Sequence, residues 1–141
     1  EKYYPAYDGK GYEVVGFGWH QGWNDGGNMD NVNAYEENLA NLIKDIRKEW
    51  KRPDLPIVIG VSGFGGRKQS TDRRLGIIAA QHAVAKRKEF KDTVASVETR
   101  DFFRPAEESP SRQGYHWNSN AETYYLIGES MGKAMVRLLT K

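Results

Sequence analysis

The sequence contains no cysteine, which excludes disulfides and thiolate metal sites. It also lacks a long apolar run: the mean hydropathy is -0.76, and no stretch approaches the length that crosses a bilayer. Neither charge is in large excess, because 21 Lys and Arg stand against 19 Asp and Glu. The resulting net charge of +2 does not favour a nucleic-acid partner. We therefore expect neither nucleic-acid binding nor membrane insertion.

No segment of the printed sequence has the pattern of a signal peptide, and the first residue is Glu1 rather than Met. We therefore expect a processed product or a fragment of a longer protein. The composition is that of a globular chain, with 38% hydrophobic and 28% charged residues over 141 positions. This length suits one domain, so we predict a single domain over residues 1–141.

Strand-like and helix-like segments alternate along the chain. Apolar, β-branched runs predict buried strands at about 12–19, 56–62 and 93–99. Helical periodicity predicts helices at about 33–50, 72–89 and 120–139. This order predicts an α/β fold, a three-layer α/β/α sandwich with a parallel sheet. Three strands make a thin sheet, so we expect this chain to form only the C-terminal β-α-β-α-β-α part of a larger domain.

Capping patterns predict where the helices begin. A capping-box spacing places the first helix start at Asn33 and the last at Ser119. Ser70 or Thr71 would cap the middle helix. The inner face of the middle helix is predicted to carry Leu75, Ile78, Ala79, His82 and Ala83. The apolar stripe of the last helix is predicted to comprise Tyr124, Ile127, Met131, Met135 and Leu138.

In parallel sheets, binding sites lie beyond the carboxyl ends of the strands. The segments expected there are residues 19–31, 62–71 and 98–118, which are rich in polar and aromatic side chains. In the first of them, an amide such as that of Gln21 could donate a hydrogen bond to a developing oxyanion. Gly22 would let the backbone approach a ligand, and Trp19 and Trp23 could stack on a sugar. The alternative is a Gly/Asn turn with two half-buried tryptophans.

His116 precedes the last predicted helix and could act as a general base for a hydroxyl nucleophile. The alternative is a loop histidine bonded to the backbone. His20 and His82 have weaker claims, and alternation at the strand end would point His20 away from Gln21. Ser62 lies in G-V-S-G-F-G, which misses the G-x-S-x-G nucleophile elbow, so we expect a turn residue there.

Two further sets of charged residues have structural interpretations. Asp25 and Asp30 are too sparse for a calcium loop, and no metal site is expected. The basic stretch at residues 86–88 lies near a helix C-terminus, where it complements the helix dipole.

Two motifs resemble those of the sialate O-acetylesterase-like domain of carbohydrate esterase family 6, within the SGNH (GDSL-type) hydrolases. Members carry W-x-Q-G-E after a central strand and D-x-x-H before the last helix. Here W-H-Q-G-W occupies residues 19–23 and Q-G-Y-H occupies residues 113–116. The resemblance runs from about residue 11 to residue 139, in the order of the family's C-terminal portion.

The resemblance implies serine-type hydrolysis of acetyl esters on sugars, with no cofactor and an acetylated carbohydrate as substrate. Gln21 would match the oxyanion donor, His116 the catalytic base, and Gly22 the position of close approach. In a second register, G-W-N-D matches the superfamily's G-x-N-D block and Asn24 becomes the donor; we prefer Gln21. The tryptophans implied to shape the sugar site are Trp19, Trp23 and Trp117. The sequence leaves the localisation unknown; the resemblance implies a periplasmic or extracellular protein.

The sequence departs from the family pattern in three ways. Trp23 replaces the motif's Glu, and Gln113 stands where the family places its triad acid. Glu98, Asp101 or Glu122 could replace that acid. No G-x-S block precedes the first strand, so a second chain or a missing N-terminal segment would supply the nucleophilic serine. The alternative is a non-catalytic carbohydrate-binding or assembly protein on the same scaffold.

Overall fold

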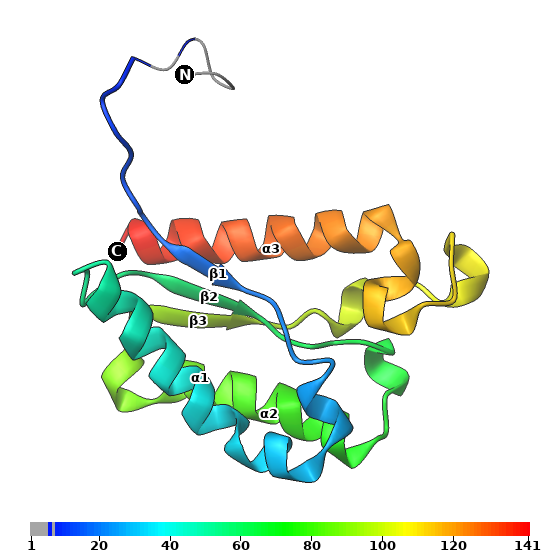
Figure 1. The fold of residues 1–141 in the computed structure, drawn as a ribbon. Helices are drawn as coiled ribbons and strands as arrows, with labels where there is room; N and C mark the ends of the chain where they lie inside the picture. Colours follow the sequence, from blue (N-terminus) through cyan, green and yellow to red (C-terminus); the bar gives the residue numbers. More distant parts are fainter. Residues whose placement is uncertain (1–5, 7) are drawn as a thin grey trace.

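The computed structural model describes residue 6 and residues 8–141, and it confirms the predicted α/β fold. Residues 1–5 and 7 of the predicted domain lie outside the described residues. The strands β1 (Phe17–Trp19), β2 (Ile57–Gly60) and β3 (Val94–Val97) form a parallel sheet in the order β1-β2-β3. Helix α3 (Ala121–Leu139) covers one face, and α1 (Met29–Glu49) and α2 (Asp72–Lys86) cover the other (Figure 1). These are the three predicted layers.

The paired strands are shorter than the apolar runs that predicted them. β1 pairs with β2 only from Phe17 opposite Ile57 to Trp19 opposite Ile59. Upstream, Tyr12 is 93% exposed and leads into the sheet as unpaired chain. The length of a strand depends on where its neighbour offers backbone partners, and an apolar run alone does not specify those partners.

Two predicted helix caps were wrong. Helix α1 begins after Asn28, whose side chain accepts a hydrogen bond from the Asp30 N–H at 2.8 Å, so Asn33 lies inside the helix. Helix α3 is capped by Asn120, which accepts from the Thr123 N–H at 3.1 Å. Ser119 cannot serve there, because its φ of 57° is left-handed whereas an N-cap residue is extended. Thr71 does precede α2, although its side chain makes no capping bond.

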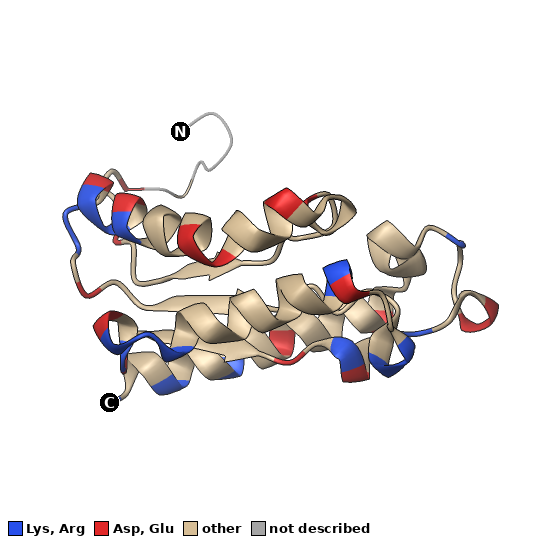
Figure 2. Cartoon of the chain, turned by 90° about the horizontal axis from the view of Figure 1, so that it is seen from below, with Lys and Arg blue, Asp and Glu red and all other residues tan. Residues whose placement is uncertain are grey.

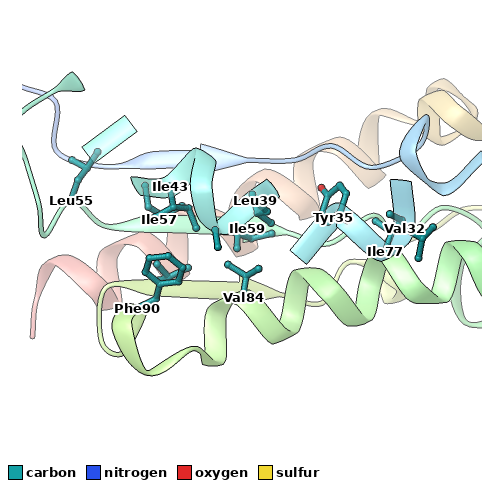
Figure 3. Packing of buried hydrophobic residues seen from close by; sticks show 12 residues of the cluster. Val32, Tyr35, Leu39, Ile43, Leu55, Ile57, Ile59, Ile77, Val84 and Phe90 are labelled. Atoms are coloured by element: carbon teal, nitrogen blue, oxygen red, sulfur yellow. The ribbon is translucent and has the colours of Figure 1, made fainter. Parts of the chain in front are cut away.

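The main core lies between the sheet and the pair α1 and α2 (Figure 3). Its fully or almost fully buried members include Ile43, Ile57, Ile59, Ile77 and Val84. The inner face of α2 agrees with the prediction at Ile78, which is buried, and differs elsewhere: Ile77, Gln81 and Val84 are also buried, while Ala79 is exposed. The helix is turned so that the polar Gln81 points inward, where its amide finds partners described below.

Helix α3 packs on the other face through Ile127 and Ala134, together with the sulfur of Met131. A Cβ on Gly60 of β2 would lie 2.7 Å from that sulfur, so glycine lets the Met131 side chain pack this close to the strand. The predicted stripe is correct for Ile127 but wrong for Tyr124, which is 46% exposed. None of the helices in the described part of the chain is long and apolar enough to span a membrane.

Candidate active site

An aromatic cluster joins three loops beyond the carboxyl ends of the strands. Phe64, after β2, packs on Trp117 from the loop before α3, with ring centroids 4.6 Å apart. Trp23, after β1, meets the Phe64 ring edge-on at 5.1 Å and contacts Tyr115 at 5.7 Å. The loops that the sequence placed at this edge therefore do meet there.

His116 lies exposed at the rim of this cluster, in the loop before α3. The next three residues, 117–119, all have left-handed φ values of 52° to 57°, which turn the chain sharply into the helix. The backbone of His116 is held on both sides: its N–H donates to the Gln113 carbonyl at 2.8 Å, and its carbonyl accepts from the Tyr124 hydroxyl at 2.9 Å. The imidazole lies against the Tyr115 ring, at 4.6 Å between centroids, and makes no hydrogen bond to another described residue. A fixed backbone thus presents an exposed imidazole.

Each carboxylate proposed as a substitute acid is bound to an arginine instead. Among the described residues, none of them contacts His116, whose imidazole makes no ion pair there. The pairs and their N–O distances are Asp101 with Arg67 at 2.8 Å, Glu98 with Arg100 at 2.6 Å, and Glu122 with Arg104 at 2.9 Å. Burial raises the pKa of Glu98, but hydrogen bonds from Arg100 and the charge of Arg67 outweigh it and lower the pKa to about 2. The structure therefore supplies none of these acids to His116.

Gln21 is held by its neighbours at both ends of its amide. Its Nε2 donates to an Asp25 carboxylate oxygen at 2.5 Å, and its Oε1 accepts from the Tyr35 hydroxyl at 3.1 Å. The Tyr35 oxygen itself accepts from Gln81 Nε2 at 3.0 Å and from Trp19 Nε1 at 3.3 Å. These donors leave the single Tyr35 proton for Gln21, where Oε1 and the backbone carbonyl, each at 3.1 Å, share it. Because Tyr35 donates on the Oε1 side, the amide is fixed with Nε2 toward Asp25.

Gln81 extends this arrangement into the core. Its side chain is fully buried, and its Nε2 also donates to the Gln21 carbonyl at 2.7 Å. Its Oε1 accepts from the Ser62 backbone N–H at 2.7 Å. One glutamine of α2 therefore ties the end of β1 to the end of β2. Sequence analysis missed this residue, since a polar side chain on a helix is normally assigned to the solvent face.

Gln21 faces a cavity of about 290 Å³ on the α1 side of the sheet. The cavity combines polar groups with an aliphatic wall, and its lining comprises Trp19, Gln21, Asp25, Tyr35, Asn38, Leu39 and Leu42. Trp19 and Gln21 therefore line the same cavity, and the contact of Trp19 with a sugar stays a prediction. His116 belongs to the aromatic cluster instead, and no contact between described residues joins it to Gln21.

Gly22 and Asn24 have different environments. A Cβ on Gly22, whose φ is 147°, would lie 2.8 Å from the Ser62 Cβ and 2.8 Å from the Ile77 side chain. Internal packing thus requires glycine at this position, and the expected close approach of a ligand stays a prediction. Asn24 is exposed, and its side chain makes no capping bond to the short turn that follows. Ser62 is 2% exposed, and its Oγ has no hydrogen-bond partner within the described structure.

Trp23 and Trp117 offer less aromatic surface than predicted. The Arg74 guanidinium lies 3.8 Å from the centroid of the Trp23 ring, covering one face, and it also donates to the Trp23 carbonyl. Trp117 is only 2% exposed, so the prediction that it contacts sugar is wrong for this arrangement. Its indole fills the space between Phe64 and His20 and is a core residue.

His20 links the aromatic cluster to the sheet. Sequence analysis gave it only a weak claim to a role. Its Nε2 accepts from Trp117 Nε1 at 3.2 Å, so its Nδ1 carries the proton donated to the Gly60 carbonyl at 2.9 Å. Burial lowers the pKa of His20, which favours this neutral form, and the Gly60 bond opposes the shift. His20 and Gln21 point to opposite sides, as the strand-end alternation predicted.

No group of three or more His, Asp or Glu suited to a metal ion occurs in the described residues.

Comparison with family models gives one finding. Residues 5–137 match the family described as carbohydrate esterase, sialic acid-specific acetylesterase. The matched range includes all three strands, most of α3 and both sequence motifs. No curated protein and no solved structure matched the chain.

Proposed function

Because the chain belongs to the sialic acid-specific acetylesterase family of carbohydrate esterases, we propose that it carries the histidine and oxyanion groups of a serine-type carbohydrate O-acetylesterase. The observation that supports this most is His116, whose imidazole is exposed while its backbone is fixed on both sides. The family description makes O-acetylated sialic acid the first substrate to test.

In the proposed reaction, a serine hydroxyl attacks the acetyl carbonyl while His116 takes the hydroxyl proton. The tetrahedral intermediate collapses, the sugar oxygen leaves with the proton from His116, and an acetyl-serine remains. Water then attacks this ester, with His116 again accepting the proton, and acetate is released. No cofactor enters either half of the reaction.

Gln21 would stabilise the negative oxygen of both tetrahedral intermediates. Its amide nitrogen carries two hydrogens, and the bond to Asp25 uses one of them. Tyr35 and Gln81 act as positioning residues, because their hydrogen bonds fix the orientation of the Gln21 amide and carbonyl. Trp19, on the wall of the same cavity, would contact the sugar.

The serine would come from a second chain or from an N-terminal segment of a longer protein. β1 is an outer strand of the described sheet, and β2 is its only partner among the described residues. An added strand beside β1 would run next to Trp19 and bring its loop toward Gln21. This free edge is where we propose that the missing part joins.

A non-catalytic carbohydrate-binding or assembly protein is the second candidate. Two observations favour it: Gln113 stands at the position of the motif acid, and the three carboxylates that could replace that acid are paired with arginines. An imidazolium that forms during catalysis would then lack a carboxylate to stabilise it.

The test is hydrolysis of O-acetylated sialic acid by the protein isolated from its source. We expect His116→Ala to lower the turnover number by about 10²–10⁴-fold, the usual contribution of a general base. His82→Ala is the matched control, because His82 lies on α2 beside Ser96 and should be neutral for turnover. Unchanged turnover in His116→Ala would exclude this residue as the base.

The intact mass of that protein separates the two candidates further. A mass above 16.1 kDa, or a second chain that co-purifies, supports an added serine-bearing part. A mass of 16.1 kDa with no second chain and no hydrolysis favours the binding protein.

A further inference from the structure

A second cavity, of about 500 Å³, lies at the other end of the sheet from the aromatic cluster. It is formed where α2 and α3 end and β3 begins. Five of its lining side chains are cationic and one is anionic: Lys86, Lys88, Lys91, Arg137 and Lys141, with Asp92. Figure 2 shows Lys and Arg segments gathered around the end of the molecule where the C-terminus lies.

The positive charge of this cavity is mostly unpaired. Asp92 pairs with Lys141 at 2.9 Å, and that hydrogen bond lowers the pKa of the Asp92 carboxyl. The other four cations have no carboxylate within 4.0 Å in the described part of the chain. The cavity therefore holds more net positive charge than the whole chain, whose net charge is +2. Such local concentration of one sign attracts anionic ligands.

The helix dipole accounts for only part of this charge. Lys86 and Arg137 lie in the last turns of α2 and α3, where cations are stabilised. Lys88 and Lys91 belong to the connection after α2 and reach the cavity from another element. Charges from three separate elements thus face one hollow, which a helix-end preference does not require.

The lining also narrows the class of ligand. The uncharged part is made of aliphatic residues, including Ala85, Val94 and Ala134, and none of the lining residues within the described part of the chain is aromatic. Nucleobases are held mainly by stacking on aromatic rings, so single-stranded nucleic acid is disfavoured. Lysines on flexible stems suit separate carboxylate or sulfate groups along a polymer.

We propose that this cavity binds an acidic polysaccharide through its carboxylate or sulfate groups. The proposal goes beyond the proposed hydrolysis, because the cavity lies away from His116 and Gln21 and binding needs no serine. Its consequence is a polymer anchored at one end of the sheet while the opposite end is free for other chemistry.

The test measures the affinity of the protein for heparin, polygalacturonate, neutral dextran and duplex DNA by titration calorimetry at two salt concentrations. We expect binding to at least one acidic glycan, weakening with salt, and none to dextran. In Lys88→Ser/Lys91→Ser the affinity should fall about tenfold, because released counterions drive such contacts. The control is Lys68→Ser/Arg73→Ser, which removes equal charge at the other end of α2, where neither residue lines the cavity, and should stay within about twofold.

Three outcomes would overturn the proposal: no acidic glycan binds, both double variants lose equal affinity, or duplex DNA binds more tightly than either acidic glycan. Circular dichroism of both double variants establishes that they fold. Arg137→Gln provides an independent cavity variant, which should also weaken the glycan. Failure of ester hydrolysis would leave this binding result unaffected, so the two proposals can fail separately.

Discussion

Replacing Gln81 by methionine tests the buried network behind Gln21. The two side chains have similar length and volume, so the change mainly removes hydrogen bonds. Gln81 donates to the Gln21 carbonyl and the Tyr35 hydroxyl, and it accepts from the Ser62 N–H. All three bonds disappear, and the Ser62 N–H is left buried without a partner.

The size of the effect follows from these contacts. An unsatisfied buried polar group costs about 1–3 kcal/mol, and the Gln21 carbonyl keeps one partner, Tyr35. We therefore expect Gln81→Met to lower the free energy of unfolding by about 2–4 kcal/mol. Urea unfolding measures it, with an unchanged slope showing that the compactness of the two states is the same.

Gln69→Met is the matched control. Gln69 also makes side-chain hydrogen bonds, to the Phe64 carbonyl and from the Thr71 N–H, but it is only partly buried, so water can reach and replace them. We expect it to cost less than about 1 kcal/mol. If the two variants unfold at the same urea concentration, the reasoning that the buried network stabilises this end of the sheet is refuted.

Two further predictions concern stability. Asn120→Ala should cost about 1 kcal/mol in urea unfolding, because its side chain caps α3, whereas Thr71→Ala should cost only a few tenths, since Thr71 makes no capping bond. The folded pKa of Glu98 is about 2, below the value of 4.5 for the free side chain, so the unfolded state binds more protons between these values. Unfolding free energy should therefore fall as the pH is lowered through this window, and Glu98→Gln should flatten that part of the profile; equal slopes in both proteins would contradict it.

The order of elements was predictable because it depends on local pattern. Apolar runs such as P-I-V-I-G-V-S and the helical spacing around Leu39 and Ile43 are visible in single segments. Strand length and helix caps were less predictable, since they depend on partners. Asn28 could not be preferred over Asn33 without knowing which residue is extended before α1.

The location of the candidate site was predictable from the sequence, but the contacts of its side chains were less so. The sequence located the loops with Gln21, Trp23 and His116 at one edge of the sheet. It could not show that Trp117 is buried. It also could not show that arginines pair with the three carboxylates considered as the acid, as Arg100 does with Glu98. Both depend on contacts between segments distant in the chain, which no local pattern records.

The saturated hydroxyl of Tyr35 has a consequence for how this protein can diverge. Its oxygen receives two hydrogen bonds and gives its proton to Gln21, so it has no spare capacity. A substitution of Tyr35 removes the acceptor of the hydrogen bonds from Gln81 and Trp19. Each of these side chains would then favour a compensating substitution. We expect these three positions to be inherited as a set and to be exchanged together when they change at all.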